Sequence, residues 1–259
     1  MRANRVRQCW EAGEPAVSAW LSIGNSYSAE IVGWTGVDCV VVDLQHGMTG
    51  VQAMIGMLQA ISSTPATPFV RVPALDLPLL MKVLDAGAYG VICPMVDSAE
   101  QAQLFVRATS YPPRGLRSFG PTRGLLYGGP DYVAHADATL VRLAMIETAA
   151  GLAEVEAICA TEGLDGIFIG PNDLGLALNA GASADPSDSR VTAAIARCAA
   201  AAKAHGKQVG IFCPSGAVAA RRAAEGFGFV VPGSDANLLK AAVSAEVRLI
   251  KADRPVGAG

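Results

Sequence analysis

The stretch Gly166-Ile167-Phe168-Ile169-Gly170-Pro171-Asn172-Asp173-Leu174 carries the pattern that decides the fold of this chain. A short apolar run, typical of a buried strand, is followed by small and polar residues that lead into a helical segment. Similar runs alternate along the sequence with longer segments rich in Ala and Leu. Such alternation is typical of repeated strand–helix units, so it predicts an α/β fold built on a parallel sheet.

Eight runs of this kind predict eight strands. They cover residues 16–23, 38–43, 68–71, 90–94, 139–146, 166–170, 208–212 and 227–231. The helical segments among them cover residues 27–35, 50–61, 77–86, 98–110, 149–160, 189–205, 216–225 and 234–252. Eight strands with interleaved helices in 259 residues match the usual size of a (β/α)8 (TIM) barrel. Because no change in composition marks a second domain, we expect residues 1–259 to form a single barrel domain.

Two longer irregular stretches interrupt this pattern. Residues 111–138 are rich in Gly and Pro, and residues 178–189 form a second stretch without periodicity. In a compact barrel, loops of this length usually cover the active site or contact another subunit.

Composition excludes several classes of protein. Hydrophobic residues make up 51% and charged residues 17%, a balance typical of a chain with a large buried core. The net charge of −3 and the absence of a Lys/Arg cluster predict no nucleic-acid partner. The sequence has no apolar run long enough for a membrane span and no signal-peptide pattern. Six cysteines are scattered singly, which favours free core thiols and a cytoplasmic location.

In a (β/α)8 barrel, the active site lies at the carboxyl ends of the strands. Glu147 and Asp173 follow two neighbouring predicted strands, so their carboxylates can meet over the mouth of the barrel. Two close carboxylates repel each other unless a proton or a cation lies between them, and oxygen donors favour Mg²⁺, Mn²⁺ or a similar ion. The alternative is that both residues only cap the helices that follow.

Other polar side chains end the neighbouring strands. Asp43, Gln45 and His46 follow the second strand, where a carboxylate could orient His46 as a proton shuttle. Arg71 ends the third strand and must find an anion there, either a core carboxylate or a bound substrate. The free backbone N–H groups of the segment Gly170-Pro171-Asn172-Asp173 offer a site for a carboxylate.

The same residues carry a family resemblance. The matching motifs are Trp20-Leu21-Ser22, Ser28-Ala29-Glu30, Val42-Asp43-Leu44-Gln45-His46, Arg71-Val72-Pro73, Leu84-Asp85-Ala86-Gly87-Ala88, Cys93-Pro94-Met95-Val96, Tyr111-Pro112-Pro113-Arg114-Gly115-Leu116-Arg117, Ile146-Glu147-Thr148 and the stretch from Gly163 to Leu174. With these motifs, the chain resembles the HpcH/HpaI family of class II, metal-dependent pyruvate aldolases, and the resemblance extends from about Trp20 to Leu239.

The resemblance implies a role for individual residues. Glu147 and Asp173 match the ligands of a divalent metal (Mg²⁺, Mn²⁺ or Co²⁺), and His46 and Asp85 match a histidine–aspartate dyad for proton transfer. Arg71 matches the arginine that faces the oxo group of the substrate. In the same way, Asn172 and Asp173 match the positions whose backbone amides hold the pyruvate carboxylate, and Asp43 matches an acid near the aldehyde-binding region.

The family further implies the reaction and the assembly. The expected reaction is the reversible retro-aldol cleavage of 4-hydroxy-2-oxo acids to pyruvate, or a related 2-oxo acid such as hydroxypyruvate, and an aldehyde. The expected assembly is a homotrimer or homohexamer, with the C-terminal helix on a neighbouring subunit and residues 111–123 near the interface.

The chain departs from the family pattern at two positions near the expected substrate. Gln45 stands where members commonly have Glu, and Met145 stands where they often have Gln. Two alternatives to a pyruvate aldolase share much of this pattern. One is a lyase that acts on a malyl- or citryl-CoA-type thioester, and the other is an inactive barrel that serves binding or assembly. No lysine ends a predicted strand, which argues against a Schiff-base aldolase.

Overall fold

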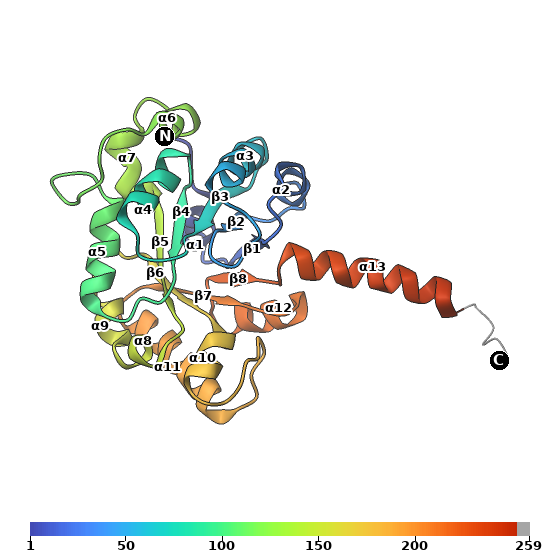
Figure 1. The fold of residues 1–259 in the computed structure, drawn as a ribbon. Coiled ribbons are helices and arrows are strands. Elements are labelled where there is room, and N and C mark those ends of the chain that lie inside the picture. The colour runs from blue at the N-terminus through green and yellow to red at the C-terminus, as the bar shows by residue number, and fades with distance from the viewer. Residues whose placement is uncertain (253–259) are drawn as a thin grey trace.

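The eight strands close into a barrel in which every strand is parallel to its neighbours and follows chain order (Figure 1). The computed structural model describes residues 1–252. The strands are β1 (Ala16–Leu21), β2 (Cys39–Asp43), β3 (Thr67–Arg71), β4 (Gly90–Cys93), β5 (Val141–Ile146), β6 (Gly166–Ile169), β7 (Gln208–Phe212) and β8 (Phe229–Val231). The predicted (β/α)8 barrel is confirmed.

Both faces of the barrel strands are buried, which is why their sequences are nearly continuous apolar runs. Side chains that point inward alternate with side chains that pack under the helices. The interior holds an aromatic cluster that includes Trp20, Phe69, Phe168 and Phe229. This packed interior supports the side chains at the carboxyl ends of the strands from below, so their positions are fixed by the barrel.

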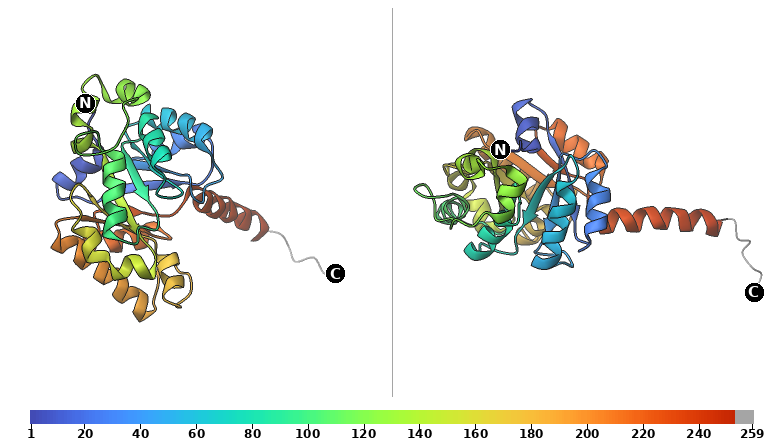
Figure 2. Two further views of the ribbon diagram at one scale, coloured as in Figure 1. Left: turned by 60° about the vertical axis from the view of Figure 1, so that its left-hand side comes forward. Right: turned by 90° about the horizontal axis from the view of Figure 1, so that it is seen from above.

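The helices surround the barrel, except for the C-terminal one, as Figures 1 and 2 show. They are α1 (Arg5–Glu11), α2 (Ser26–Gly33), α3 (Val51–Ser62), α4 (Leu77–Asp85), α5 (Ala99–Thr109), α6 (Thr122–Gly128), α7 (Tyr132–Thr139), α8 (Ala149–Ala153), α9 (Val155–Cys159), α10 (Pro171–Ala177), α11 (Ser189–Ala204), α12 (Gly216–Ala224) and α13 (Asp235–Ala252). The predicted helix 149–160 is two short helices, α8 and α9. Helix α1, whose Val6 is buried in the interior cluster, was not among the predicted helices.

The segment 111–138 does not cover the active site of its own chain. It connects α5 to β5, and a helix-to-strand connection in such a barrel lies at the amino ends of the strands, opposite the site. Much of it is helical, in α6 and α7, and Arg123 in α6 donates to the carbonyl oxygen of Ala86. The stretch therefore does not cover the site of its own chain, and contact with another subunit stays a prediction.

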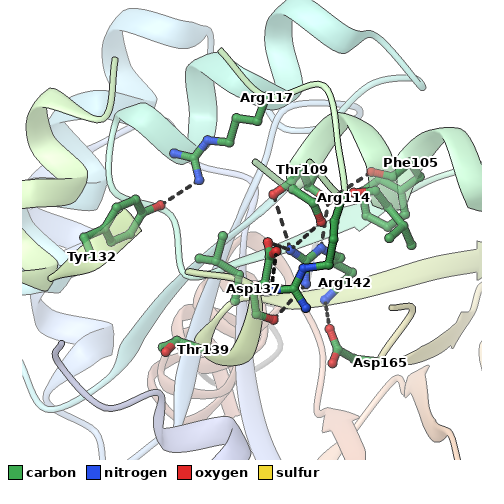
Figure 3. A network of polar contacts seen from close by, with 12 residues as sticks. Phe105, Thr109, Arg114, Arg117, Tyr132, Asp137, Thr139, Arg142 and Asp165 are labelled. Carbon is green, nitrogen blue, oxygen red and sulfur yellow. Dashed lines mark hydrogen bonds and ion pairs between the residues drawn. The ribbon is translucent and has the colours of Figure 1, made fainter. Parts of the chain in front are cut away.

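A network of charged side chains lies outside the barrel wall, near the amino end of β5 (Figure 3). The buried guanidinium of Arg142 donates to Asp137 Oδ1, to Ser110 Oγ and to both oxygen atoms of Thr109. Asp165 accepts from the backbone N–H of Arg142 at 2.7 Å and from Arg7 of α1 at 2.6 Å. Because every charge in this network has a partner, we assign it a structural role.

Helix α13 projects away from the barrel, as all three views in Figures 1 and 2 show. Its exposed apolar side chains include Leu239, Val243, Val247 and Ile250, which recur at helical spacing on one side. Within residues 1–252, none of the helices is both long and apolar enough to cross a membrane.

Candidate active site

A cavity of about 220 Å³ opens at the carboxyl ends of the strands. Eight of the residues expected at the site line it, including Asp43, His46, Arg71, Met145, Gly170 and Asp173. Pro171 and Asn172 line it as well, together with Trp20, Ser22, Phe168, Phe212 and Ser234. These residues come from strands and loops that are far apart in the sequence, so the barrel brings them together as the sequence analysis predicted.

Asp43 and Arg71 form a two-point ion pair. The two residues are partners in the register of β2 and β3, and Arg71 donates from Nε to Asp43 Oδ1 at 2.8 Å and from Nη2 to Oδ2 at 2.5 Å. Burial alone would raise the pKa of Asp43, but the hydrogen bonds and charge of Arg71 hold it below its usual value. Of the two anions considered for Arg71, a core carboxylate is thus present in the fold itself.

Glu147 is buried beside the cavity. It follows β5, its Oε1 accepts a hydrogen bond from the backbone N–H of Met95 at 3.0 Å, and its side chain lies against Gly170. Burial, together with the nearby charge of Asp173, raises the pKa of Glu147 to about 7. Asp173 itself is exposed in the first turn of α10 and lines the cavity. Two carboxylates that lie close together repel each other, and this repulsion contributes to the raised pKa of Glu147. The raised pKa therefore agrees with the predicted proximity of Glu147 and Asp173.

The start of α10 turns backbone donors toward the cavity. Leu174 is the first residue whose N–H bonds to a carbonyl of this turn, that of Gly170. The N–H groups of Asn172 and Asp173 precede it, so they have no acceptor within the helix. They are therefore free to bind an anion, as the sequence predicted for this segment.

His46 and Asp85 do not meet within one chain. His46 is exposed at the cavity, and its backbone N–H donates to Asp43 Oδ1 at 3.2 Å. Asp85 ends α4 at the other end of the barrel, where it forms an ion pair with Arg117 at 3.0 Å. Asp43 thus fixes the backbone of His46, and the expectation that a carboxylate orients the imidazole is not met within the described residues.

The two departures from the family pattern lie in different surroundings. Met145 points into the barrel and lines the cavity. Gln45 donates its backbone N–H to Asp43, while its buried side-chain Oε1 has no partner among the described residues. Gln45 is not part of the cavity wall, so direct contact with a substrate stays a prediction.

Several residues of the site carry no recognisable signal in the sequence. Trp20, Phe168 and Phe212 look like ordinary core residues in apolar strands, yet they form part of the cavity wall. Met95 adopts a left-handed backbone conformation (φ 51°), which accompanies the hydrogen bond from its N–H to Glu147. Positive φ is uncommon for a residue other than glycine, and no side-chain pattern announces it.

The donor set suits a hard divalent cation only in part. Within residues 1–252 no group of three or more His, Cys, Asp or Glu side chains could hold a metal. Glu147 and Asp173 supply two carboxylates, and Mg²⁺ typically takes one or two carboxylates with water or substrate oxygens as its remaining ligands. The pair therefore fits an ion that the substrate helps to bind.

The fold and the site define an enzyme of the (β/α)8-barrel class, with its functional groups at the carboxyl ends of the strands. Residues 17–242 match the family model described as HpcH/HpaI aldolase/citrate lyase. The chain belongs to this family. It is a carbon–carbon lyase of the aldolase type, in a family that generally depends on a divalent metal.

Similar proteins extend over nearly the whole chain. A hydroxypyruvate/pyruvate aldolase from Rhizorhabdus wittichii is 46% identical over 92% of this chain and 95% of its own length. A 5-keto-4-deoxy-D-glucarate aldolase from Klebsiella pneumoniae is 37% identical over 92% of this chain and 93% of its own. A crystal structure of a family member from Burkholderia cenocepacia superposes with a TM-score of 0.89 at 32% identity, covering 96% of this chain and all of the other.

Proposed function

We propose that this enzyme catalyses the reversible retro-aldol cleavage of 4-hydroxy-2-oxo acids to pyruvate or hydroxypyruvate and an aldehyde. The observation that carries the proposal is the convergence of Asp173, Arg71 and His46 on one small cavity, with Glu147 buried beside it. The relatives named as hydroxypyruvate/pyruvate and 5-keto-4-deoxy-D-glucarate aldolases support this choice of substrate class.

In this proposal, Glu147 and Asp173 hold the divalent ion, which can be Mg²⁺, Mn²⁺ or Co²⁺. The ion supplies Lewis-acid polarisation of the carboxylate and oxo oxygens of the substrate. The backbone N–H groups of Asn172 and Asp173, with Gly170 and Pro171 shaping the turn, bind the carboxylate of the oxo acid.

Arg71 and His46 act on the reacting atoms. In cleavage, His46 accepts the proton of the 4-hydroxyl group, the C3–C4 bond breaks, and its electron pair moves toward the 2-oxo oxygen. The guanidinium of Arg71 stabilises the negative charge on that oxygen. Asp43 keeps Arg71 in place through Nε and Nη2, which leaves Nη1 for the substrate. A proton returned to C3 then completes the oxo acid.

Asp85 can act as the partner of His46 only from a second copy of the chain, because the two residues lie at opposite ends of one barrel. We therefore propose a homotrimer or homohexamer in which Asp85 and α13 face neighbouring subunits. The exposed apolar side of α13 supports such an assembly. The six cysteines are free thiols, which favours a reducing compartment such as the cytoplasm.

The size of the cavity argues against a CoA-thioester lyase. About 220 Å³ suits a small oxo acid and is below the 300 Å³ or more typical of sites for drug-sized ligands. None of the five lysines lines the cavity, so the described residues offer no Schiff-base nucleophile there. In an inactive barrel, binding of the oxo acid would not depend on the metal.

A screen of donors and acceptors tests the proposal. Pyruvate and hydroxypyruvate are each incubated with several aldehydes, with Mg²⁺, Mn²⁺ or Co²⁺ or with a chelator, and the aldol product is measured. We expect product only with metal and no trapping of the enzyme by borohydride. Full activity after thorough removal of metal would contradict the proposal. Calorimetry that detects no metal-dependent binding of pyruvate would instead support the inactive barrel.

A further inference from the structure

Trp20 lies at the centre of the site without an evident chemical role. It is on β1, its side chain points into the barrel, and only 4% of its surface is exposed. Even so, its indole forms part of the cavity wall beside Arg71. An indole in this place could simply fill space, so its contacts decide whether it does more.

The indole contacts both members of the Asp43–Arg71 pair. Its Nε1–H donates to Asp43 Oδ2 at 3.2 Å, and the guanidinium carbon of Arg71 lies 4.8 Å from the centre of its ring. The first contact is a hydrogen bond to a charged acceptor, and the second is a cation–π interaction in a buried place. Trp20 therefore holds the ion pair from two sides, with its edge and with its face.

The ring is itself held on its other side. Phe168 of β6 stacks on it with a centroid distance of 5.4 Å, and Phe212 of β7 meets it edge-on at 5.9 Å. Trp20 therefore connects the Asp43–Arg71 pair across the barrel interior to β6 and β7, and β6 leads to Asp173. We expect this set of stacked aromatic rings to fix the plane of the Arg71 guanidinium relative to Glu147 and Asp173.

We propose that Trp20 is a positioning residue that sets the orientation of Arg71 for the charge that develops in the reaction. The inference rests on the proposed function, in which Arg71 faces the 2-oxo oxygen. Asp43 alone fixes the guanidinium in its own plane through Nε and Nη2. The indole face adds the second constraint, because it prevents the guanidinium from tilting out of that plane.

Two substitutions distinguish the contribution of the indole N–H from that of the indole face. Trp20→Phe keeps an aromatic face and loses the N–H donor, so we expect a fall in kcat/KM of about tenfold, the effect of one hydrogen bond to a charged group. Trp20→Leu loses both contacts, and we expect a fall of about 100-fold because the cation–π interaction is lost as well. Trp34→Phe, at the exposed tryptophan that follows the last residue of α2, is the matched control and should keep full activity.

The division of the effect between kcat and KM distinguishes positioning from a collapsed cavity. Arg71 acts on charge that develops during the reaction, so the loss should fall on kcat, while metal-dependent binding of pyruvate changes less than about threefold. A loss that falls entirely on pyruvate binding in Trp20→Phe would overturn the inference.

A double-mutant cycle with Arg71→Lys tests whether Trp20 acts through Arg71. A lysine keeps the charge but not the planar fork, so Trp20→Leu in this background should cost less than about threefold in kcat/KM. The same 100-fold loss in both backgrounds would overturn the inference. The same four proteins are also compared by their urea midpoints of unfolding, a measurement that needs no substrate. The effects of the two substitutions on this midpoint should also be non-additive. If that coupling is found but the wild-type enzyme forms no aldol product, the proposed function fails and the contact between Trp20 and Arg71 stands.

Discussion

His46 and Asp85 lie at opposite ends of the barrel: His46 follows the carboxyl end of β2, and Asp85 ends α4 shortly before β4 begins. The carboxylate of Asp85 is directed by Arg117, whose side chain is fully buried and also donates to the hydroxyl of Tyr132 at 2.9 Å. A carboxylate held in a fixed position in this way is suited to contact a residue of another subunit. A histidine–aspartate dyad can therefore form only between two chains.

Mixed assemblies test this geometry. We expect His46→Ala and Asp85→Asn each to lower kcat by about 100-fold or more, the usual contribution of a proton-transfer group. When the two variants are unfolded together and refolded as hybrids, some sites combine an intact His46 with an intact Asp85. Part of the activity should then return, measured as pyruvate release. Hybrids that stay as inactive as the parent variants would contradict a dyad formed between subunits.

The raised pKa of Glu147 predicts how the metal-free protein responds to pH. Burial and the charge of Asp173 raise this pKa from an ordinary 4.5 to about 7, so the folded state binds the proton more tightly than the unfolded state. The resulting stability is complete below about pH 4.5 and is lost as the pH rises through 7, by about 3 kcal/mol at most. Urea unfolding between pH 5 and pH 8 in a chelator measures the loss.

Glu147→Gln is the control for this effect, because the amide does not titrate. The variant should lack the Glu147 contribution, while the histidines and other groups titrate as before. In the wild type, a saturating divalent ion should restore stability at pH 8, since a metal takes the place of the proton between the two carboxylates. An identical pH dependence in the wild type and in Glu147→Gln would show that Glu147 does not titrate in this range.

Gly170 is predicted to tolerate no side chain. A Cβ atom at this position would lie 2.6 Å from Met145 Cε and 2.8 Å from Glu147 Oε2. The flexible end of Met145 can move away, but the carboxylate must then leave its place. We expect Gly170→Ala to lower kcat/KM by about 100-fold, the cost of a displacement near 1 Å at a catalytic site. Gly216→Ala, where no atom lies within 4 Å, is the matched control. A fully active Gly170→Ala enzyme with normal metal affinity would show that the position of Glu147 is not critical.

The strands and their polar ends could be predicted because each signal is local. Apolar runs such as the one before Asp173 mark a strand buried on both faces, and the residue that ends the run must lie at the mouth of the barrel. Trp20 carried no such signal, since an indole within an apolar strand predicts only a core residue. Its role depends on Asp43 and Arg71, which come from other strands.

Asp85 was predicted only through the family resemblance, and Met95 was not predicted at all, for different reasons. Asp85 belongs to a helix end that only the closed barrel places opposite His46, so its proposed action depends on a neighbouring chain. The contribution of Met95 is a backbone N–H in a left-handed conformation, and a side chain does not encode it. Residues 111–138 were predicted as irregular because Gly and Pro hide the short helices α6 and α7.

The apolar side of α13 predicts a dependence of the assembly on this helix. Leu239, Val243, Val247 and Ile250 lie within about 80° of one another around the helix axis, given 3.6 residues per turn, and are 40–65% exposed. Val243→Asp with Val247→Asp should reduce the oligomer to a smaller species in light scattering, because charged groups do not enter an apolar interface without a large desolvation cost. Ala241→Asp, on the opposite side of the helix, should leave the assembly intact. If the double variant keeps the wild-type mass, α13 does not hold the subunits together; if it dissociates, activity should fall with the mass, since Asp85 then has no neighbouring His46 to reach.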